Sequence, residues 1–275
     1  EALLFAMSGL QKLDRHYARK ENLFFPYLEK AGITGPPQVM WGVDDEIRAM
    51  LKDIQSTESG DHALLDLVDS ALAEITAMIK KENEILSPLL LQAVTHEDWL
   101  QIAEDSPAIG FAFNGGIEGA SPSDAVQWAL ERKFKVPAAG IQDETHSEGV
   151  ISLPSGELRI EQLIHMLNTS PQDFTYIDAE DKVRYFSEGK HPVFPRTRTI
   201  IGRDVRHCHP PKAQEVVNQL LIDFKAGTKD EEVRVVLAGP RILLIRYYAV
   251  RSEEGEYLGT LETTEEISSI VEEVK

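Results

Sequence analysis

The stretch Ile200-Ile-Gly-Arg-Asp-Val-Arg-His-Cys-His-Pro-Pro-Lys212 decides the fold of the second half of this 275-residue chain. Before it, Asp173 to Phe186 forms two short apolar runs joined at an acidic turn, which predicts a hairpin. After it, Pro210-Pro211 opens an amphipathic helix, and three strand-like runs lie between Glu232 and Glu262. This order predicts a five-stranded antiparallel sheet with helices on one face.

A further helix is predicted over residues 158–167, just before the hairpin. Its apolar residues, typical of an amphipathic helix, are Leu158, Ile160, Leu163, Ile164 and Leu167. Because an amphipathic helix needs a cover for its apolar stripe, we expect this helix to serve as a dimer contact and the protein to be a homodimer.

Residues 1–105 show helical periodicity throughout. The first helical pattern stops near Phe25-Pro26, and a second follows Gly32-Ile-Thr-Gly-Pro-Pro37. A third runs from about Asp61 to Ser87-Pro88, where proline should end or kink it. Amphipathic helices of this kind must pack together, so we expect an antiparallel helical bundle.

The bundle contains a faint internal repeat. Arg19-Lys-Glu-Asn-Leu-Phe-Phe-Pro26 is similar to Lys80-Lys-Glu-Asn-Glu-Ile-Leu-Ser-Pro88, with one residue inserted in the second copy. The predicted organisation is therefore α+β, with a bundle at 1–105, a connector at 106–156 that holds a short helix at 123–133, and a second domain at 157–275.

Composition limits the possible partners. The net charge of −18 disfavours nucleic acid and anionic membranes, and no run is long and apolar enough to span a bilayer. Without a secretory leader, we expect a cytoplasmic protein. The single Cys208 excludes an intrachain disulfide. No catalytic triad, phosphate loop or dinucleotide fingerprint is present, so we expect no enzyme activity.

The second half resembles a PAS domain over residues 157–275. Gly202-Arg203-Asp204-Val205 matches a turn common before the long helix of PAS domains, and His209-Pro210 matches the start of that helix. Tyr257 to Ile267 resembles the last strand. The resemblance implies a sensory or regulatory role, with a small-molecule ligand or a protein partner.

The first half resembles a hemerythrin-like bundle, in which four helices surround two irons. His16-Tyr-Ala-Arg-Lys-Glu-Asn-Leu-Phe-Phe-Pro26 carries this likeness. More narrowly, the chain resembles a prokaryotic family of unknown function that pairs a hemerythrin-like region with a PAS domain, and which implies no established chemistry.

Several residues are candidates for a site in the PAS domain. Arg246 and Tyr248 share one face of a predicted strand and could hold an anion, although alternation does not show whether that face points inward. An outward face is the alternative. Tyr185 is a third candidate. His207 and His209 could bind haem iron beside Cys208, or could instead satisfy backbone groups at the helix start.

The metal candidates in the bundle are His16, Glu21, Asp45 and Glu82. In hemerythrin-like domains Glu follows His by four residues, but here that position is Lys20, and Glu21 lies about 140° around the helix. These carboxylates could bind a hard cation. Alternatively, Lys20 and Lys81 could pair with them and replace metal charge with protein charge. We therefore favour no cofactor over iron in the bundle or haem in the PAS domain.

Overall fold

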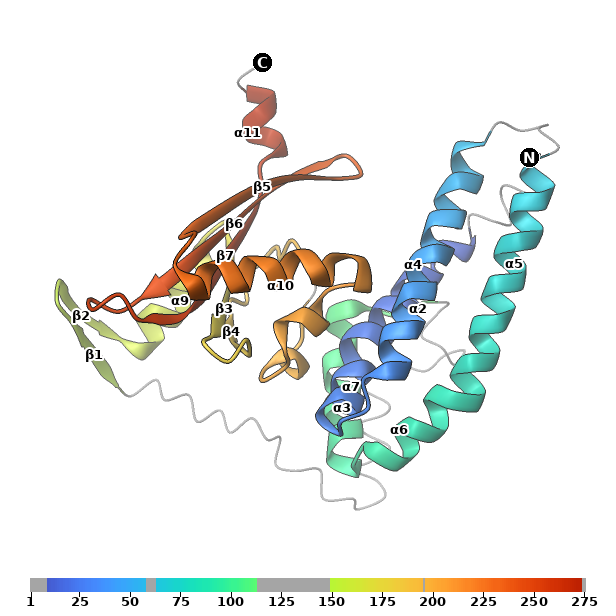
Figure 1. The fold of residues 1–275 in the computed structure, drawn as a ribbon, viewed down its shortest axis with the longest axis horizontal. Coiled ribbons are helices and arrows are strands. Elements are labelled where there is room, and N and C mark those ends of the chain that lie inside the picture. Colours follow the sequence, from blue (N-terminus) through green and yellow to red (C-terminus); the bar gives the residue numbers. More distant parts are fainter. Residues whose placement is uncertain (1–8, 58–62, 113–148, 195, 274–275) are drawn as a thin grey trace. The chain divides into compact units, whose positions relative to one another are not determined.

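The protein is described here by a computed structural model, which covers residues 9–57, 63–112, 149–194 and 196–273 (Figure 1). The chain divides into two compact units. The helical unit holds Glu1–Val136, Arg196–Ile200 and His209–Ala213, and the second unit holds Pro137–Pro195, Ile201–Cys208 and Gln214–Lys275. The helix predicted at 123–133 lies outside the described residues.

The helical unit consists of antiparallel helices, as predicted. In chain order its described elements are α2 (Leu13–Arg19), η1 (Lys20–Phe24), α3 (Phe25–Lys30), α4 (Gly35–Ser56), α5 (Ala63–Lys81), η2 (Glu82–Leu86), α6 (Ser87–Ala93) and α7 (His96–Ile109). The prolines after Gly35 open α4, and Thr95 forms a capping box with Asp98 at the start of α7.

Both copies of the internal repeat contain a π-helical turn, η1 in the first copy and η2 in the second. Pro26 and Pro88 follow these turns at the second positions of α3 and α6. The prediction that the first helix ends near Pro26 is wrong. A π turn widens the backbone just before proline, so the missing N–H and the ring are accommodated and the helix continues to Lys30.

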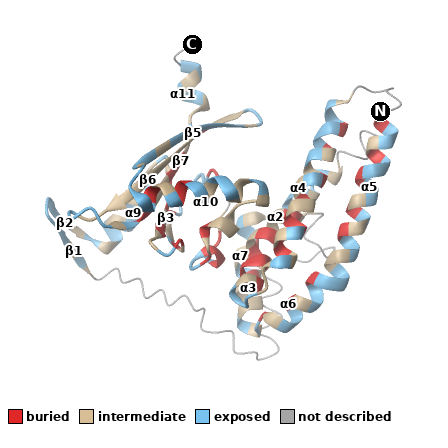
Figure 2. Ribbon diagram, viewed as in Figure 1, coloured by how far each residue is buried: buried red, intermediate tan, exposed pale blue. Residues whose placement is uncertain are grey.

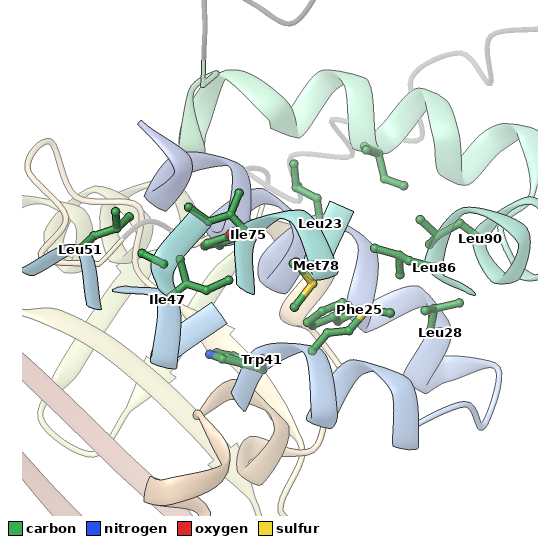
Figure 3. Packing of buried hydrophobic residues seen from close by; sticks show 14 of the residues in the cluster. Leu23, Phe25, Leu28, Trp41, Ile47, Leu51, Ile75, Met78, Leu86 and Leu90 are labelled. Atoms are coloured by element: carbon green, nitrogen blue, oxygen red, sulfur yellow. The ribbon is translucent and has the colours of Figure 1, made fainter. Parts of the chain in front are cut away.

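The core of the helical unit is formed by one continuous cluster of apolar side chains (Figure 3). Leu23 and Phe25 enter it from the first repeat copy, Leu86 enters from the second, and Met78 enters from α5 just before that copy. Burial follows the inward-facing stripes of the helices, whereas the opposite stripes are exposed (Figure 2).

The helical unit also includes a segment from late in the chain, Arg196–Ile200. In this segment the Thr199 hydroxyl donates a hydrogen bond of 2.6 Å to the carbonyl oxygen of Asn22. Pro26 lacks the N–H that would bond this carbonyl in a regular α-helix, so the carbonyl needs another donor. The proline of the repeat thereby creates the acceptor that Thr199 uses.

The second unit is built on a five-stranded antiparallel sheet, which confirms the predicted fold class. Its strand order is β4-β3-β7-β6-β5. The strands are β3 (Asp173–Asp178), β4 (Val183–Phe186), β5 (Glu231–Ala238), β6 (Arg241–Arg251) and β7 (Tyr257–Glu266), and the long helix is α10 (Pro211–Ala226). The short helices η4 (Arg198–Ile200) and η5 (Val205–Cys208) precede α10, and α11 (Ser268–Glu273) follows the sheet.

The segment before the sheet differs from the prediction. A small hairpin of β1 (Val150–Leu153) and β2 (Gly156–Arg159) precedes α9 (Ile160–Thr169), so the helix predicted at 158–167 begins two residues too early. Leu158 alternates with polar neighbours in a strand, and Gln162 caps the true helix start by accepting from Arg159 N–H. None of the residues of α9 is buried.

The two faces of the sheet differ in burial. Leu243, Ile177 and Val183 are buried on one face, which we call the covered face. With the exception of Thr263, the buried side chains of the five strands lie on it. The opposite, outer face carries exposed apolar side chains at the edge strand β5, including Leu237, which is 75% exposed.

Candidate functional site

A buried charge cluster lies at the centre of the helical unit. Lys20, at the start of the first π turn, is 1% exposed, and its Nζ donates to Asp44 Oδ1 at 2.8 Å and to Glu82 Oε1 at 2.6 Å. Glu82 Oε2 lies 3.0 Å from His16 Nε2, and the Lys20 ammonium lies 4.6 Å from the centre of the Tyr17 ring. One lysine ammonium therefore holds together carboxylates from α4 and the second π turn.

A second cation, Arg48, lies next to this group. It bonds Glu21 through both amino nitrogens, with Nη1–Oε1 at 2.7 Å and Nη2–Oε2 at 3.0 Å. Arg48 also donates to Asp14 and Asp45, at 2.7 and 3.0 Å. Burial raises the pKa of Glu21 to about 7, although the hydrogen bonds from Arg48 oppose the rise.

The two carboxylates bound to Lys20 differ in their electrostatics. Burial raises the pKa of Asp44 to about 6 despite the nearby ammonium, and no described residue hydrogen-bonds its Oδ2. Burial also acts to raise the pKa of Glu82, but hydrogen bonds from His16 and Lys20 outweigh it, and the pKa lies below its usual value. Asp44 thus depends on Lys20 more strongly than Glu82 does.

This donor set, with Lys20 in place, fits a metal ion poorly. The ammonium already lies between the carboxylates of Asp44 and Glu82, and a second cation beside it would be repelled. His16 supplies the single imidazole of the cluster. Within the described ranges, no group of three or more His, Cys, Asp or Glu side chains is arranged to hold a metal ion.

The structure places the predicted metal residues in separate ion pairs. His16 and Glu82 meet each other, whereas Glu21 and Asp45 both bind Arg48. Their metal role stays a prediction. The alternative in which lysine pairs with these carboxylates holds for Lys20 and Glu82.

On the covered face of the sheet, a row of polar and aromatic side chains crosses four strands. Tyr247 of β6 lies opposite Glu262 of β7, which lies opposite Thr175 of β3, which in turn lies opposite Phe186 of β4. Directly opposed residues point to the same side, about 4.5–5.5 Å apart. Thr264, on the same face, donates to Glu262 Oε1 at 3.3 Å. The row gives the covered face a carboxylate, hydroxyls and aromatic rings.

The residues predicted for a PAS pocket come from different elements of the chain. Tyr185, Arg246 and Tyr248 fall on the outer face, opposite to Leu243 and Ile177. His207 lies in η5, and His209 belongs to the helical unit. Their ligand role, and haem binding at the histidines, stay predictions.

Four residues of the charge cluster and the polar row were not predicted from the sequence. Asp44 and Arg48 lie on either side of the predicted Asp45, and their helical spacing of four residues was the available signal. Thr175 and Glu262 carried no signal beyond their alternation in strands.

The turn between β3 and β4 is fixed by a separate ion-pair network. Asp181 takes a positive φ of 64° and its Oδ1 lies 2.6 Å from Lys225 Nζ on α10. Asp204 is bonded by Arg206 through Nε at 2.7 Å and Nη2 at 2.6 Å. This network joins the hairpin turn, η5 and the end of α10, and so holds the helix against the sheet unit.

Both units match known domain families. Residues 3–90 match the hemerythrin HHE cation binding domain, and residues 163–268 match a PAS domain family. The protein therefore combines a hemerythrin-like helical domain with a PAS domain, as the sequence resemblance implied.

The solved structures that resemble this chain each cover less than half of it. The C-terminal domain of a Streptococcus mutans protein is 27% identical, with 46% of this chain and 98% of that chain covered and a TM-score of 0.43. A PAS domain from Colwellia psychrerythraea is 12% identical, with 40% and 98% covered and a TM-score of 0.32. A sensory box sensor histidine kinase from Vibrio cholerae is 10% identical, with 38% and 89% covered and a TM-score of 0.30.

No curated protein matches the chain. Among the helices that the structure describes, none is long and apolar enough to cross a membrane.

Proposed function

We propose that this is a sensory or regulatory protein whose PAS domain binds a small ligand and whose helical domain responds to it. The observation that carries the proposal is the polar covered face of the PAS sheet. Thr175, Thr260 and Thr264 are all buried there, where packing alone would favour apolar side chains. Polar groups that converge on a partly covered face are typical of ligand sites.

In this proposal the helical domain responds to the PAS domain, and a lysine, not a metal ion, balances its buried carboxylates. Lys20 supplies the positive charge between Asp44 and Glu82 that a bound cation would otherwise supply. A bundle organised in this way folds without metal, so its state can depend on the PAS domain alone.

Coupling would follow a population shift, in which the ligand favours one packing of α10 on the sheet. Chain connectivity supports this link. The segments Arg196–Ile200 and His209–Ala213 belong to the helical unit, while the residues around them belong to the PAS unit. A movement of η5 or α10 would therefore act directly on residues attached to the helical unit.

The ligand proposal is tested by mass spectrometry of the full chain. The protein is purified under mild conditions and compared in native and denaturing spectra. We expect a small molecule that is present in the native spectrum and released on denaturation. Stoichiometric release from the protein but not from a Thr175→Val variant supports the covered face as its site. A ligand retained by that variant contradicts it.

We further propose a homodimer through α9. Ile164 and Met166 are exposed apolar residues of a helix that has no buried residue. Light scattering of the full chain should show a dimer, and Ile164→Lys should convert it to a monomer. His165→Lys, about 100° around the same helix from Ile164, adds equal charge and should leave the dimer intact. A wild-type monomer excludes this contact.

The competing proposal, a bundle that binds iron, is favoured by the description of its family as cation binding. Metal analysis of anaerobically purified full chain separates the two proposals. Near-stoichiometric iron that is lost in His16→Ala would support a metalloprotein and contradict the proposal that Lys20 replaces the metal.

A further inference from the structure

Thr175 is a buried polar residue without a partner. It is 5% exposed, lies on the covered face of the PAS sheet, and no residue in the described part of the chain hydrogen-bonds its Oγ1. Native proteins pair nearly all buried polar groups, so this hydroxyl is available to hydrogen-bond a bound molecule.

The neighbours of Thr175 on the covered face are partly accessible. Glu262 lies directly opposite it, and Tyr247 lies opposite Glu262 on the next strand. Phe186 flanks Thr175 on the other side. These three side chains are half-buried, in contrast to Thr175 itself. A small molecule above Glu262 can therefore reach the buried hydroxyl.

The part of this face formed by β3 and β7 favours positive charge, whereas Arg234 and Arg241 lie on the same face of β5 and β6. Its side chains on β3 and β7 include the carboxylates of Asp173 and Glu262 and no Lys or Arg. Asp173 Oδ2 already accepts the backbone N–H of Val193 at 2.7 Å. Carboxylate and hydroxyl oxygens accept hydrogen bonds from an ammonium group, and the face of a tyrosine ring attracts a cation.

We propose that Glu262, Thr175 and Tyr247 bind a small organic cation that carries a primary ammonium group. The ammonium donates to the Glu262 carboxylate and to Thr175 Oγ1, and the Tyr247 ring lies beside it. This inference rests on the proposed ligand-binding function of the PAS domain and names the chemical class of its ligand.

Three probes of equal chain length test the class: butylamine, 1-butanol and butyrate. Isothermal titration calorimetry of the full chain should show binding of butylamine and none, or far weaker binding, of the other two. Glu262→Gln should weaken butylamine binding by about tenfold or more, as expected for the loss of a charge-assisted hydrogen bond. Glu265→Gln, on the outer face of the same strand, is the matched control and should leave binding unchanged.

A second variant keeps the test independent of folding. Thr175→Val preserves the shape of the side chain and removes a hydroxyl that has no partner. The ligand-free variant should therefore unfold at the wild-type temperature or up to about 2–4 °C above it, while binding butylamine more weakly. A variant that unfolds several degrees below wild type would show that the hydroxyl has a structural partner, and would overturn the proposal.

The remaining outcomes are also decisive. Butyrate binding that exceeds butylamine binding, or equal losses in Glu262→Gln and Glu265→Gln, overturns the cation class. If no probe binds, the proposed class is wrong. In that case the broader proposal of a ligand still stands if mass spectrometry finds a released compound. If no compound is released, both proposals are wrong.

Discussion

Replacement of Lys20 by methionine removes the cation at the centre of the helical domain. Methionine keeps the length and apolar volume of the lysine stem, so packing around Tyr17 is preserved. The change leaves Asp44, 0% exposed, and Glu82 without their shared ammonium at 2.8 and 2.6 Å.

The cost follows from the unpaired carboxylates. Removal of one partner from a buried ion pair typically destabilises a protein by about 3–5 kcal/mol. Asp44 should account for most of it, because its second oxygen has no partner among the described residues, whereas Glu82 retains His16. We therefore expect a loss of about 3–5 kcal/mol in Lys20→Met, and recovery of about half of it in Lys20→Met/Asp44→Asn.

Tryptophan fluorescence during urea unfolding measures this loss in the full chain. Trp41 and Trp99 belong to the helical domain, and residues 149–275 contain no tryptophan, so the signal does not follow the PAS sheet. Lys81→Met, the counterpart of Lys20 in the second repeat, is the control and should cost less than about 1 kcal/mol.

Equal stability of Lys20→Met and Lys81→Met would refute the reasoning. Failure of Asp44→Asn to restore stability would also contradict it, since the buried charge of Asp44 is the stated cause of the loss.

Two further predictions concern the PAS domain. Gly259→Ala should prevent folding of the sheet, because an added Cβ would collide with the Ile177 carbonyl oxygen. Gly189→Ala is the control, because a Cβ there has room. Circular dichroism should show loss of folded structure in Gly259→Ala alone. Burial acts to raise the pKa of Asp204, but hydrogen bonds from Arg206 prevail and hold it at about 2. A carboxylate whose pKa is lower in the folded than in the unfolded protein stabilises the fold at pH values above its unfolded pKa. The wild-type protein should therefore lose about 1–2 kcal/mol of unfolding free energy from this group between pH 4 and 2, and Asp204→Asn should not.

The order of elements in the PAS domain could be predicted from local patterns. Alternation marked the strands, and the prolines at 210 and 211 marked the start of α10, because side-chain period and proline geometry are local properties. The boundary at α9 was placed too early because the apolar Leu158, which belongs to β2, comes just before the apolar residues of the helix.

The continuation of the helices through Pro26 and Pro88 could not be predicted in the same way. A proline in an amphipathic pattern normally signals an end, and no residue type marks a π turn. The repeated Lys-Glu-Asn segments showed where the two turns lie without showing what they are.

The chain alone was therefore enough to indicate two domains, their families, and that an ammonium rather than a carboxylate follows His16 by four residues. Folding supplied the rest. Lys20 meets partners that are 24 and 62 residues away, and Arg246 and Tyr248 were assigned to the outer face by the burial of Leu243. Period and propensity act over a few residues, whereas the burial of a charge and the inward side of a strand depend on segments that meet after long loops close.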